Sequence, residues 1–206
     1  MNEPAVFLDI DTQVDFMVPT GSLYVPGAEG IIPNLKKLMV YAQEQGIPVL
    51  SSADAHLPDD PSFAQWPPHC VIGTPGQRRI RETQLASPDV IPNRPGAFVS
   101  PGRWSGQTVI EKTEYDVSTN PNFEAILTSL GGSLGQPRFV VFGVATEYCV
   151  RGAALALRER GLRVDLVTDA IRAITEEGGR KAVEEMRAAQ VHLVKTAEVC
   201  AARQAA

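Results

Sequence analysis

One cysteine stands where a predicted strand gives way to a predicted helix. The segment Gly143–Cys149 follows an apolar run, and Thr146 is expected to cap the helix, which places Cys149 in its first turn. The helix dipole at that position favours a thiolate and is expected to lower the thiol pKa. Free N–H groups of the same turn can stabilise an oxyanion. Cys149 is therefore the candidate nucleophile, and the alternative is a small buried core residue.

A thiol nucleophile needs a proton acceptor and an orienting charge. Asp11 and Lys112 each follow an apolar run, as Cys149 does. Residues beyond the carboxyl ends of parallel strands meet at one edge of the sheet. Asp11 is the candidate base and later acid, and Lys112 is the candidate cation that holds the carboxylate and the thiolate. Taken singly, Asp11 could equally cap a loop and Lys112 could equally lie on the surface.

A second group of residues has the types and spacing of metal ligands. Asp54 and His56 occupy alternate positions of an extended segment, and His69 follows in a loop rich in proline. One carboxylate and two imidazoles suit Zn, Fe or Mn and leave positions for water. Ser62 could contribute directly or through water. We predict one divalent metal ion with a substrate-binding or Lewis-acid role, and the alternative is an ordered loop with incidental histidines.

Short apolar runs alternate with helical patterns along the chain, and these elements must position the candidate residues. We expect strands at 5–8, 47–51, 108–111, 138–143, 163–168 and 191–194. We expect helices at 31–45, at 122–130, at 147–160 and through residues 183–186. Continuous apolar runs indicate parallel strands buried on both faces. The predicted fold is one domain over residues 1–206, a three-layer α/β/α sandwich with a six-stranded parallel sheet.

Composition excludes several classes of partner. The net charge of −5 gives no basic face for nucleic acid or an anionic membrane. The basic residues at 77–81 are interpreted as a solvated helix face. Three cysteines do not make a disulfide framework. We see no signal peptide and no apolar run long enough to span a membrane, so we expect a cytoplasmic protein.

The motifs, taken together, resemble those of the isochorismatase-like cysteine hydrolases, and within them the nicotinamidase (pyrazinamidase) branch. The segments that carry the resemblance run in the family's order: Asp11-Thr-Gln-Val-Asp-Phe16 with Gly21-Ser-Leu, Asp54-Ala-His56, Trp66-Pro-Pro-His-Cys-Val-Ile-Gly-Thr-Pro-Gly76, Glu111-Lys112 and Gly143-Val-Ala-Thr-Glu-Tyr-Cys-Val-Arg151. They cover most of the chain and are very specific jointly.

The resemblance implies roles for these residues. It implies a six-stranded parallel sheet flanked by helices, and a metal that binds the pyridine nitrogen of nicotinamide. It also implies a cis peptide bond before Ala145. The roles are a triad of Asp11, Lys112 and Cys149, metal ligands Asp54, His56 and His69, an aromatic pocket with Phe16 and Trp66, and an oxyanion hole at the N–H groups of Ala145 and Cys149.

The function so implied is hydrolysis of a linear amide bond, most simply nicotinamide to nicotinate and ammonia in NAD salvage, through a thioester on Cys149. Two features depart from the branch: Ala55 stands where an aromatic residue is usual, and the segment 113–122 is unusual. The alternatives are another small amide, carbamoyl or vinyl-ether substrate, and a non-catalytic interaction domain. By analogy with the fold class, the chain could form a homo-oligomer.

Overall fold

The computed structural model describes residues 4–201, and in that range seven strands form one sheet in the order β3-β4-β2-β1-β5-β6-β7. Every neighbouring pair of strands is parallel. The strands are β1 (Ala5–Ile10), β2 (Val49–Asp54), β3 (Asp89–Ile91), β4 (Gln107–Lys112), β5 (Arg138–Val144), β6 (Arg163–Arg172) and β7 (His192–Val194). The connections between parallel strands must cross over the sheet, which is where the helices lie.

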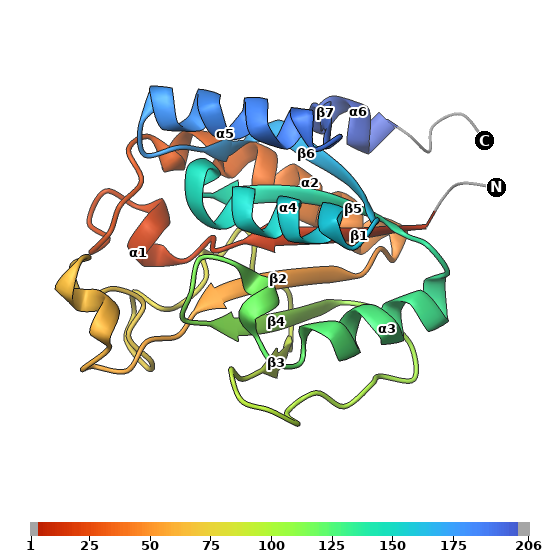
Figure 1. Ribbon diagram of the computed structural model, residues 1–206, viewed down its shortest axis with the longest axis horizontal. Helices are drawn as coiled ribbons and strands as arrows, with labels where there is room; N and C mark the ends of the chain where they lie inside the picture. Colours follow the sequence, from red (N-terminus) through yellow and green to blue (C-terminus); the bar gives the residue numbers. More distant parts are fainter. Residues whose placement is uncertain (1–3, 202–206) are drawn as a thin grey trace.

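Helices cover both faces of the sheet (Figure 1). The helices are α1 (Val14–Met17), α2 (Ile32–Gln45), α3 (Phe123–Leu134), α4 (Arg151–Glu159), α5 (Glu176–Ala188) and α6 (Thr196–Ala201). Buried residues of α3, α4 and α5 pack in one apolar core, whereas those of α2 and α6 pack in a second core on the opposite face. None of the helices within residues 4–201 is both long and apolar enough to cross a membrane.

The pattern of apolar residues explains how the layers form. β2 is buried along its whole length, as expected for a strand covered on both faces. On α2, the buried side chains of Leu35, Leu38 and Met39 recur at helical spacing and face the sheet. The helix ends at Gly46, which adopts a left-handed conformation (φ 63°) that favours glycine.

The predicted three-layer parallel architecture is confirmed, but the predicted number of strands is wrong. The additional strand, β3, pairs with β4 at one edge of the sheet. It is three residues long, and of these only Ile91 is buried. An edge strand with one buried residue leaves no apolar run in the sequence, which is why the pattern did not reveal it.

The interpretation of residues 77–81 as a solvated helix face is also wrong. This segment contains no helix, and the side chain of Arg79 is only 4% exposed. Its guanidinium contacts the carboxylate of Asp9 on β1 and donates to the backbone oxygen of Ser52 on β2, with N···O 3.1 Å. The arginine therefore joins two neighbouring strands close to their carboxyl ends.

The topology brings the candidate residues to one edge of the sheet. In the sheet order, β4, β2, β1 and β5 are successive neighbours. Lys112 ends β4, Asp54 ends β2, Asp11 follows β1, and Cys149 follows β5. In Figure 1 the arrowheads of β2 and β4 point left, towards the long segment that leaves β2. The candidate site is therefore built from four adjacent strand ends.

Candidate active site

The candidate triad meets around the ammonium group of Lys112, which is fully buried. Its Nζ lies 2.8 Å from Asp11 Oδ2 and 3.6 Å from Cys149 Sγ. It also donates to Asp54 Oδ1. Asp11 and Cys149 are buried as well, so one cation faces two carboxylates and a thiol away from bulk water. This is the arrangement that an assisted thiol nucleophile requires.

Asp11 has an unusual backbone. Its φ is 47°, in the left-handed region that non-glycine residues seldom occupy. Two contacts hold it there: its N–H donates to Ser52 Oγ at 3.2 Å, and its Oδ1 accepts from Ser52 Oγ at 2.6 Å. Sparsely populated conformations of this kind concentrate at functional sites, where the surrounding structure enforces them.

Cys149 lies in a turn of π-helix, η4 (Thr146–Val150), which leads directly into α4. The first-turn position is as predicted, but the predicted cap is wrong: Ala145 precedes the helix, and no side chain caps it. Single turns of π-helix occur frequently at functional sites. Of the three cysteines, all of which the structure describes, Cys149 lines the pocket described below.

The expected lowering of the thiol pKa is also wrong. Burial raises the pKa of the Cys149 thiol well above its ordinary value, and the Lys112 cation offsets this only in part. The neighbouring carboxylates of Asp11 and Asp54 raise the pKa further. The resting group is therefore a neutral thiol, which must lose its proton to a base before it can act as a nucleophile.

The two carboxylates have different environments. Burial raises the pKa of Asp11 above its ordinary value of 3.8, and Lys112 opposes the shift without cancelling it. Burial would also raise the pKa of Asp54, but the Lys112 cation holds it well below its usual range. Burial alone would lower the pKa of Lys112, yet Asp11 and Asp54 raise it well above the ordinary value. Asp54 thus stays ionised, whereas Asp11 is suited to carry a proton.

The candidate metal ligands form one buried group. Potential ligand atoms of Asp54, His56 and His69 all lie within 4.8 Å of one another. Both Nε2 atoms are 3.6 Å from the same oxygen, Asp54 Oδ2. The other oxygen of Asp54 contacts Lys112. Asp54 therefore belongs to both groups and connects the candidate metal site with the candidate triad.

Hydrogen bonds fix which histidine nitrogens are available. Nδ1 of His56 lies 2.9 Å from Asp60 Oδ2, and Nδ1 of His69 lies 2.8 Å from the backbone oxygen of Pro67. Both partners only accept, so we assign the protons to Nδ1. Nε2 of His56 is buried without a hydrogen-bond partner among the described residues. Two imidazole lone pairs and an ionised oxygen that face one another fit a divalent cation.

Ser62 is not brought into this group by any contact described for it. Its hydroxyl donates to Asp60 Oδ1 at 2.6 Å, and its N–H donates to the same oxygen at 2.9 Å. Asp60 in turn holds His56 through its other oxygen. Ser62 therefore contacts Asp60 rather than the candidate metal site itself. It orients the Asp60 carboxylate, which in turn fixes the ring of the candidate ligand His56.

A cavity of about 50 Å³ opens beside Cys149 and the candidate metal ligands. Its lining is mostly apolar and aromatic: Asp11, Phe16, Leu23, Val25, Asp54, Trp66, His69, Tyr115, Val144, Ala145, Tyr148, Cys149 and Ile174. Phe16 and Trp66, both predicted from the resemblance, are in this wall. The ring centroid of Phe16 lies 5.5 Å from that of His69. A mostly apolar lining with a few polar groups is typical of a small-molecule site.

The sequence did not indicate two aromatic residues of this wall, Tyr115 and Tyr148. Trp66 Nε1 donates to the hydroxyl of Tyr115 at 3.0 Å, and the rings of Tyr115 and Tyr148 lie 5.1 Å apart. Tyr115 belongs to the unusual segment after Lys112, so that departure from the family pattern was the available signal. The three rings together form the aromatic mouth of the cavity.

The structure contains the expected cis peptide bond between Val144 and Ala145. Ala145 and Cys149 both line the cavity, at the end of β5 and in the turn that follows. Their N–H groups are thus carried by the same short segment as the candidate nucleophile, which is the arrangement proposed for an oxyanion hole.

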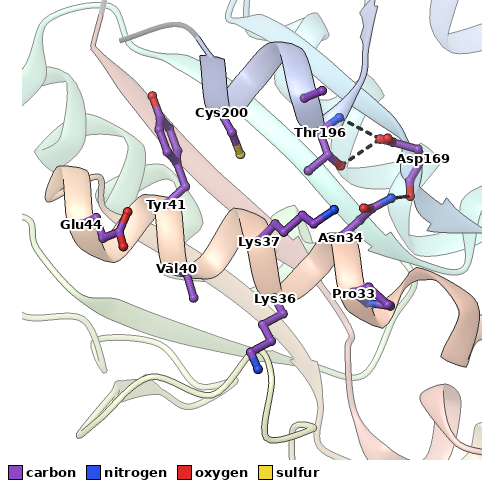
Figure 2. Close-up of a pocket in the computed structure, with 11 residues that line it drawn as sticks. Pro33, Asn34, Lys36, Lys37, Val40, Tyr41, Glu44, Asp169, Thr196 and Cys200 are labelled. Carbon is purple, nitrogen blue, oxygen red and sulfur yellow. Dashed lines mark hydrogen bonds between the residues drawn. The ribbon is translucent and has the colours of Figure 1, made fainter. Parts of the chain in front are cut away.

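A second hollow of about 590 Å³ lies between α2 and α6 (Figure 2). Three of its polar residues pair with each other: Asn34 donates to the backbone oxygen of Asp169, and Thr196 donates to the Asp169 carboxylate. It shares no lining residue with the cavity beside Cys149. This hollow therefore adds nothing to the candidate catalytic group.

Known proteins resemble the chain over nearly its full length. The sequence model of the isochorismatase domain matches residues 5–198. The nicotinamidase/pyrazinamidase of Mycobacterium tuberculosis is 28% identical over 192 residues, which are 90% of this chain and 95% of that protein. The nicotinamidase of Escherichia coli is 25% identical over 224 residues, which are 95% of this chain and 96% of that protein.

The same similarity extends to solved structures. The pyrazinamidase of Pyrococcus horikoshii, crystallised in complex with zinc, is 29% identical and has a TM-score of 0.75. The match covers 93% of this chain and 98% of that one.

Proposed function

The chain belongs to the isochorismatase family of hydrolases, and from this premise we propose that it is a metal-containing cysteine amidohydrolase that converts nicotinamide and water to nicotinate and ammonia. One observation carries the proposal: Asp11, Lys112 and Cys149 meet in a buried cluster that shares Asp54 with an Asp–His–His group. The names of the full-length relatives support nicotinamide as the substrate.

The first half of the reaction forms a thioester. Asp11 takes the proton of the Cys149 thiol, and the thiolate sulfur attacks the carbonyl carbon of the amide. The oxygen gains negative charge and faces the N–H groups of Ala145 and Cys149. Asp11 then gives its proton to the amide nitrogen, the C–N bond breaks, and ammonia leaves.

The second half returns the enzyme to its starting state. Asp11, again a carboxylate, takes a proton from water while the water oxygen attacks the thioester carbon. The C–S bond breaks, the acid is released, and the sulfur recovers a proton from Asp11. Throughout, Lys112 stabilises whichever of its neighbours is negatively charged, because it lies within 3.6 Å of Cys149 Sγ and 2.8 Å of Asp11 Oδ2.

The metal site fits this reaction. Asp54, His56 and His69 would hold one divalent ion, Zn, Fe or Mn, which supplies a positive charge that can bind a lone pair of the substrate, such as the pyridine nitrogen. The aromatic wall formed by Phe16 and Trp66 would bind the faces of a planar ring. These two contacts would orient the amide towards Cys149.

A second candidate function keeps the chemistry and changes the substrate. Tyr115 enters the cavity from the unusual segment after Lys112, and the free volume is about 50 Å³. Such a small cavity favours a small amide or carbamoyl compound. A non-catalytic interaction domain fits less well, because a buried cluster of a lysine, two carboxylates and a thiol has no evident use in a docking surface.

Ammonia release tests the proposal. Purified protein with added Zn, Fe or Mn is assayed on nicotinamide and on a panel of small amides and carbamoyl compounds. We expect nicotinamide to be hydrolysed, and Cys149→Ala to lower the rate by roughly 10³-fold or more, whereas Cys200→Ala keeps it. Hydrolysis of another panel member in place of nicotinamide would favour the second candidate. Full activity of Cys149→Ala would contradict the thioester mechanism.

A further inference from the structure

The hydroxyl of Ser52 holds Asp11 at two points. It donates to Asp11 Oδ1 at 2.6 Å and accepts from the Asp11 N–H at 3.2 Å. Ser52 lies on the interior strand β2 and is completely buried. Both contacts span neighbouring strands, because Asp11 follows β1. The residue played no part in the sequence-based prediction of the site.

Only a group that both donates and accepts can make this pair of contacts. A hydroxyl has one O–H donor and two acceptor lone pairs, whereas an alanine or valine side chain in its place has neither. Without it, the N–H of Asp11 would lose its buried acceptor, and one carboxylate oxygen would lose a hydrogen bond. The left-handed conformation of Asp11, with φ 47°, makes that support more important.

The two oxygens of Asp11 are not equivalent. Oδ1 accepts the Ser52 hydroxyl. Oδ2 pairs with Lys112 Nζ at 2.8 Å, and no other partner is found for it among the described residues. It is therefore the oxygen with a lone pair free to take a proton from a thiol that contacts the same lysine.

We propose that Ser52 is a positioning residue that locks the Asp11 carboxylate so that Oδ1 stays bound and Oδ2 carries the proton between Cys149, the leaving nitrogen and water. The inference rests on the proposed function of Asp11 as the base. A carboxylate that loses this bond can rotate about its Cβ–Cγ axis, and both oxygens then compete for the lysine and the thiol. The proton transfers slow down, while substrate binding by the aromatic wall and the metal ligands is retained.

A matched pair of substitutions isolates the hydroxyl. Thr and Val have nearly the same shape, so Ser52→Thr and Ser52→Val add equal bulk to β2 and differ in the hydrogen-bonding group. Ser51→Ala is the control for loss of a buried hydroxyl: Ser51 is the preceding residue, is equally buried, and points to the opposite face of the sheet, where it contacts Asp9 and Gln107.

We expect Ser52→Val to lower kcat by roughly 10- to 100-fold relative to Ser52→Thr, the range for loss of a hydrogen bond to a charged group, with KM changed by less than about twofold. Ser51→Ala should not lower kcat comparably. Equal kcat values for the Thr and Val variants, or an equal loss in Ser51→Ala, would overturn the proposal, because packing alone would then explain the effect. If the branched side chains prevent folding, Ser52→Ala is compared with wild type in the same way.

A second readout does not depend on amide hydrolysis. The rate at which iodoacetamide alkylates Cys149 is measured at pH 7 by mass spectrometry of the peptide that contains it. The Ser52→Val variant should react more slowly than Ser52→Thr, because the base that removes the thiol proton is misplaced. Equal alkylation rates would overturn the positioning role. If the wild-type protein hydrolyses no amide but the alkylation rates differ as expected, the proposed function fails while the role of Ser52 stands.

Discussion

At the scale of single residues, the candidate site depends on how one carboxylate differs from another. Asp54 and Asp11 both lie against Lys112, and burial acts on each of them. At Asp54 the Lys112 cation outweighs burial and keeps the carboxyl ionised, whereas at Asp11 burial outweighs both Lys112 and the Ser52 hydrogen bond and raises the pKa. This difference assigns a fixed negative charge to Asp54 and the mobile proton to Asp11.

The pH dependence of the reaction tests that assignment. Asp11 must be ionised to act as the base, and burial raises its pKa above 3.8. As pH falls, kcat/KM should therefore decline with a midpoint above 3.8, and it should recover as pH rises through that midpoint. Asp11→Asn should lower kcat by about 10²- to 10⁴-fold.

Asp89→Asn is the control for that experiment, since Asp89 is an exposed carboxyl on the edge strand β3. It should leave both the rate and the midpoint unchanged. Steady-state kinetics between pH 3 and 9 at constant ionic strength measure both. An Asp11→Asn variant with wild-type kcat would remove Asp11 from the mechanism.

The buried pair of Asp9 and Arg79 makes a prediction about stability. Arg79 also donates to Thr12 Oγ1 at 2.7 Å, so it contacts residues on both sides of Asp11. Removing one partner leaves an uncompensated buried charge, so Arg79→Met should lower the free energy of unfolding by about 3–5 kcal/mol. The double variant Asp9→Leu/Arg79→Met should recover most of that loss. Urea denaturation of wild type, Arg79→Met and the double variant measures the three free energies of unfolding.

An exposed ion pair provides the comparison. Arg151 pairs with Glu185, and these side chains are 37% and 48% exposed. Arg151→Met should cost about 1 kcal/mol or less. If Arg79→Met were no more destabilising than Arg151→Met, the Asp9 carboxylate would have to be compensated in some other way.

At the scale of helices and strands, the parts of the site that could be predicted are those fixed by strand order. Asp11, Lys112 and Cys149 each follow an apolar run, and parallel strands place such residues at one edge whatever the details of packing. Ser52 and Arg79 could not be found in this way. Their roles depend on strand register and on the path of a loop, and a serine within a strand or an arginine in a basic segment has no distinctive pattern.

Element bounds were harder to predict than element types. The segment around Cys149 was expected to be helical, and it is, but its first turn has π geometry without a threonine cap. β3 was missed because one buried residue gives no periodicity. Helix position alone predicts a lowered thiol pKa at Cys149, whereas burial, which is the larger influence, raises it.

The aromatic mouth formed by Trp66, Tyr115 and Tyr148 should limit the size of molecules that reach Cys149. A cavity of about 50 Å³ holds only a few water molecules, so these rings must move to admit an aromatic amide. Tyr115→Ala should raise the rate at which N-phenylmaleimide modifies Cys149 by about tenfold, with little change for the smaller iodoacetamide. Peptide mass spectrometry measures both rates.

Tyr115→Phe separates the ring of Tyr115 from its hydroxyl. It keeps the ring but removes the hydrogen bond from Trp66. If the ring fills the mouth, this variant should resemble wild type. If it instead resembles Tyr115→Ala, the bond to Trp66 holds the mouth closed. If the ratio of the N-phenylmaleimide rate to the iodoacetamide rate is the same in wild type, Tyr115→Ala and Tyr115→Phe, Tyr115 does not restrict access to Cys149.

The end of β5 depends on a glycine. Gly143 has φ 120°, and a Cβ atom at this position would clash with the backbone oxygen of Ile10 on β1. Gly143→Ala should therefore lower the free energy of unfolding by roughly 2–4 kcal/mol, from backbone strain and overpacking combined. Gly161 has φ 74° with open space around it, so Gly161→Ala should cost about 1 kcal/mol. Urea denaturation measures both free energies of unfolding. Similar losses in the two variants would argue against a clash between a Cβ atom at position 143 and the backbone of Ile10.

At the scale of the whole molecule, the candidate metal site joins the end of β2 to the long loop that follows it. Asp54 ends β2, whereas His56 and His69 come from the loop. The three ligands converge only when this loop packs against the strand ends. A metal ion should therefore bind the folded chain far better than the unfolded chain.

The division of the chain, one domain over residues 1–206, remains a prediction, and a single unfolding transition would agree with it.

Metal binding should therefore raise the melting temperature of the protein. A ligand at about 100 times its Kd that binds only the folded state adds about 2.7 kcal/mol, which corresponds to roughly 5–11 °C for a chain of this length. Calorimetry of protein freed of metal by a chelator, before and after addition of Zn, Mn or Fe, measures the shift. The double variant His56→Ala/His69→Ala should lose it, because only Asp54 of the buried group remains. His192→Ala should keep it, since that side chain is 82% exposed on β7. An equal shift in the double variant would place the bound metal elsewhere on the molecule.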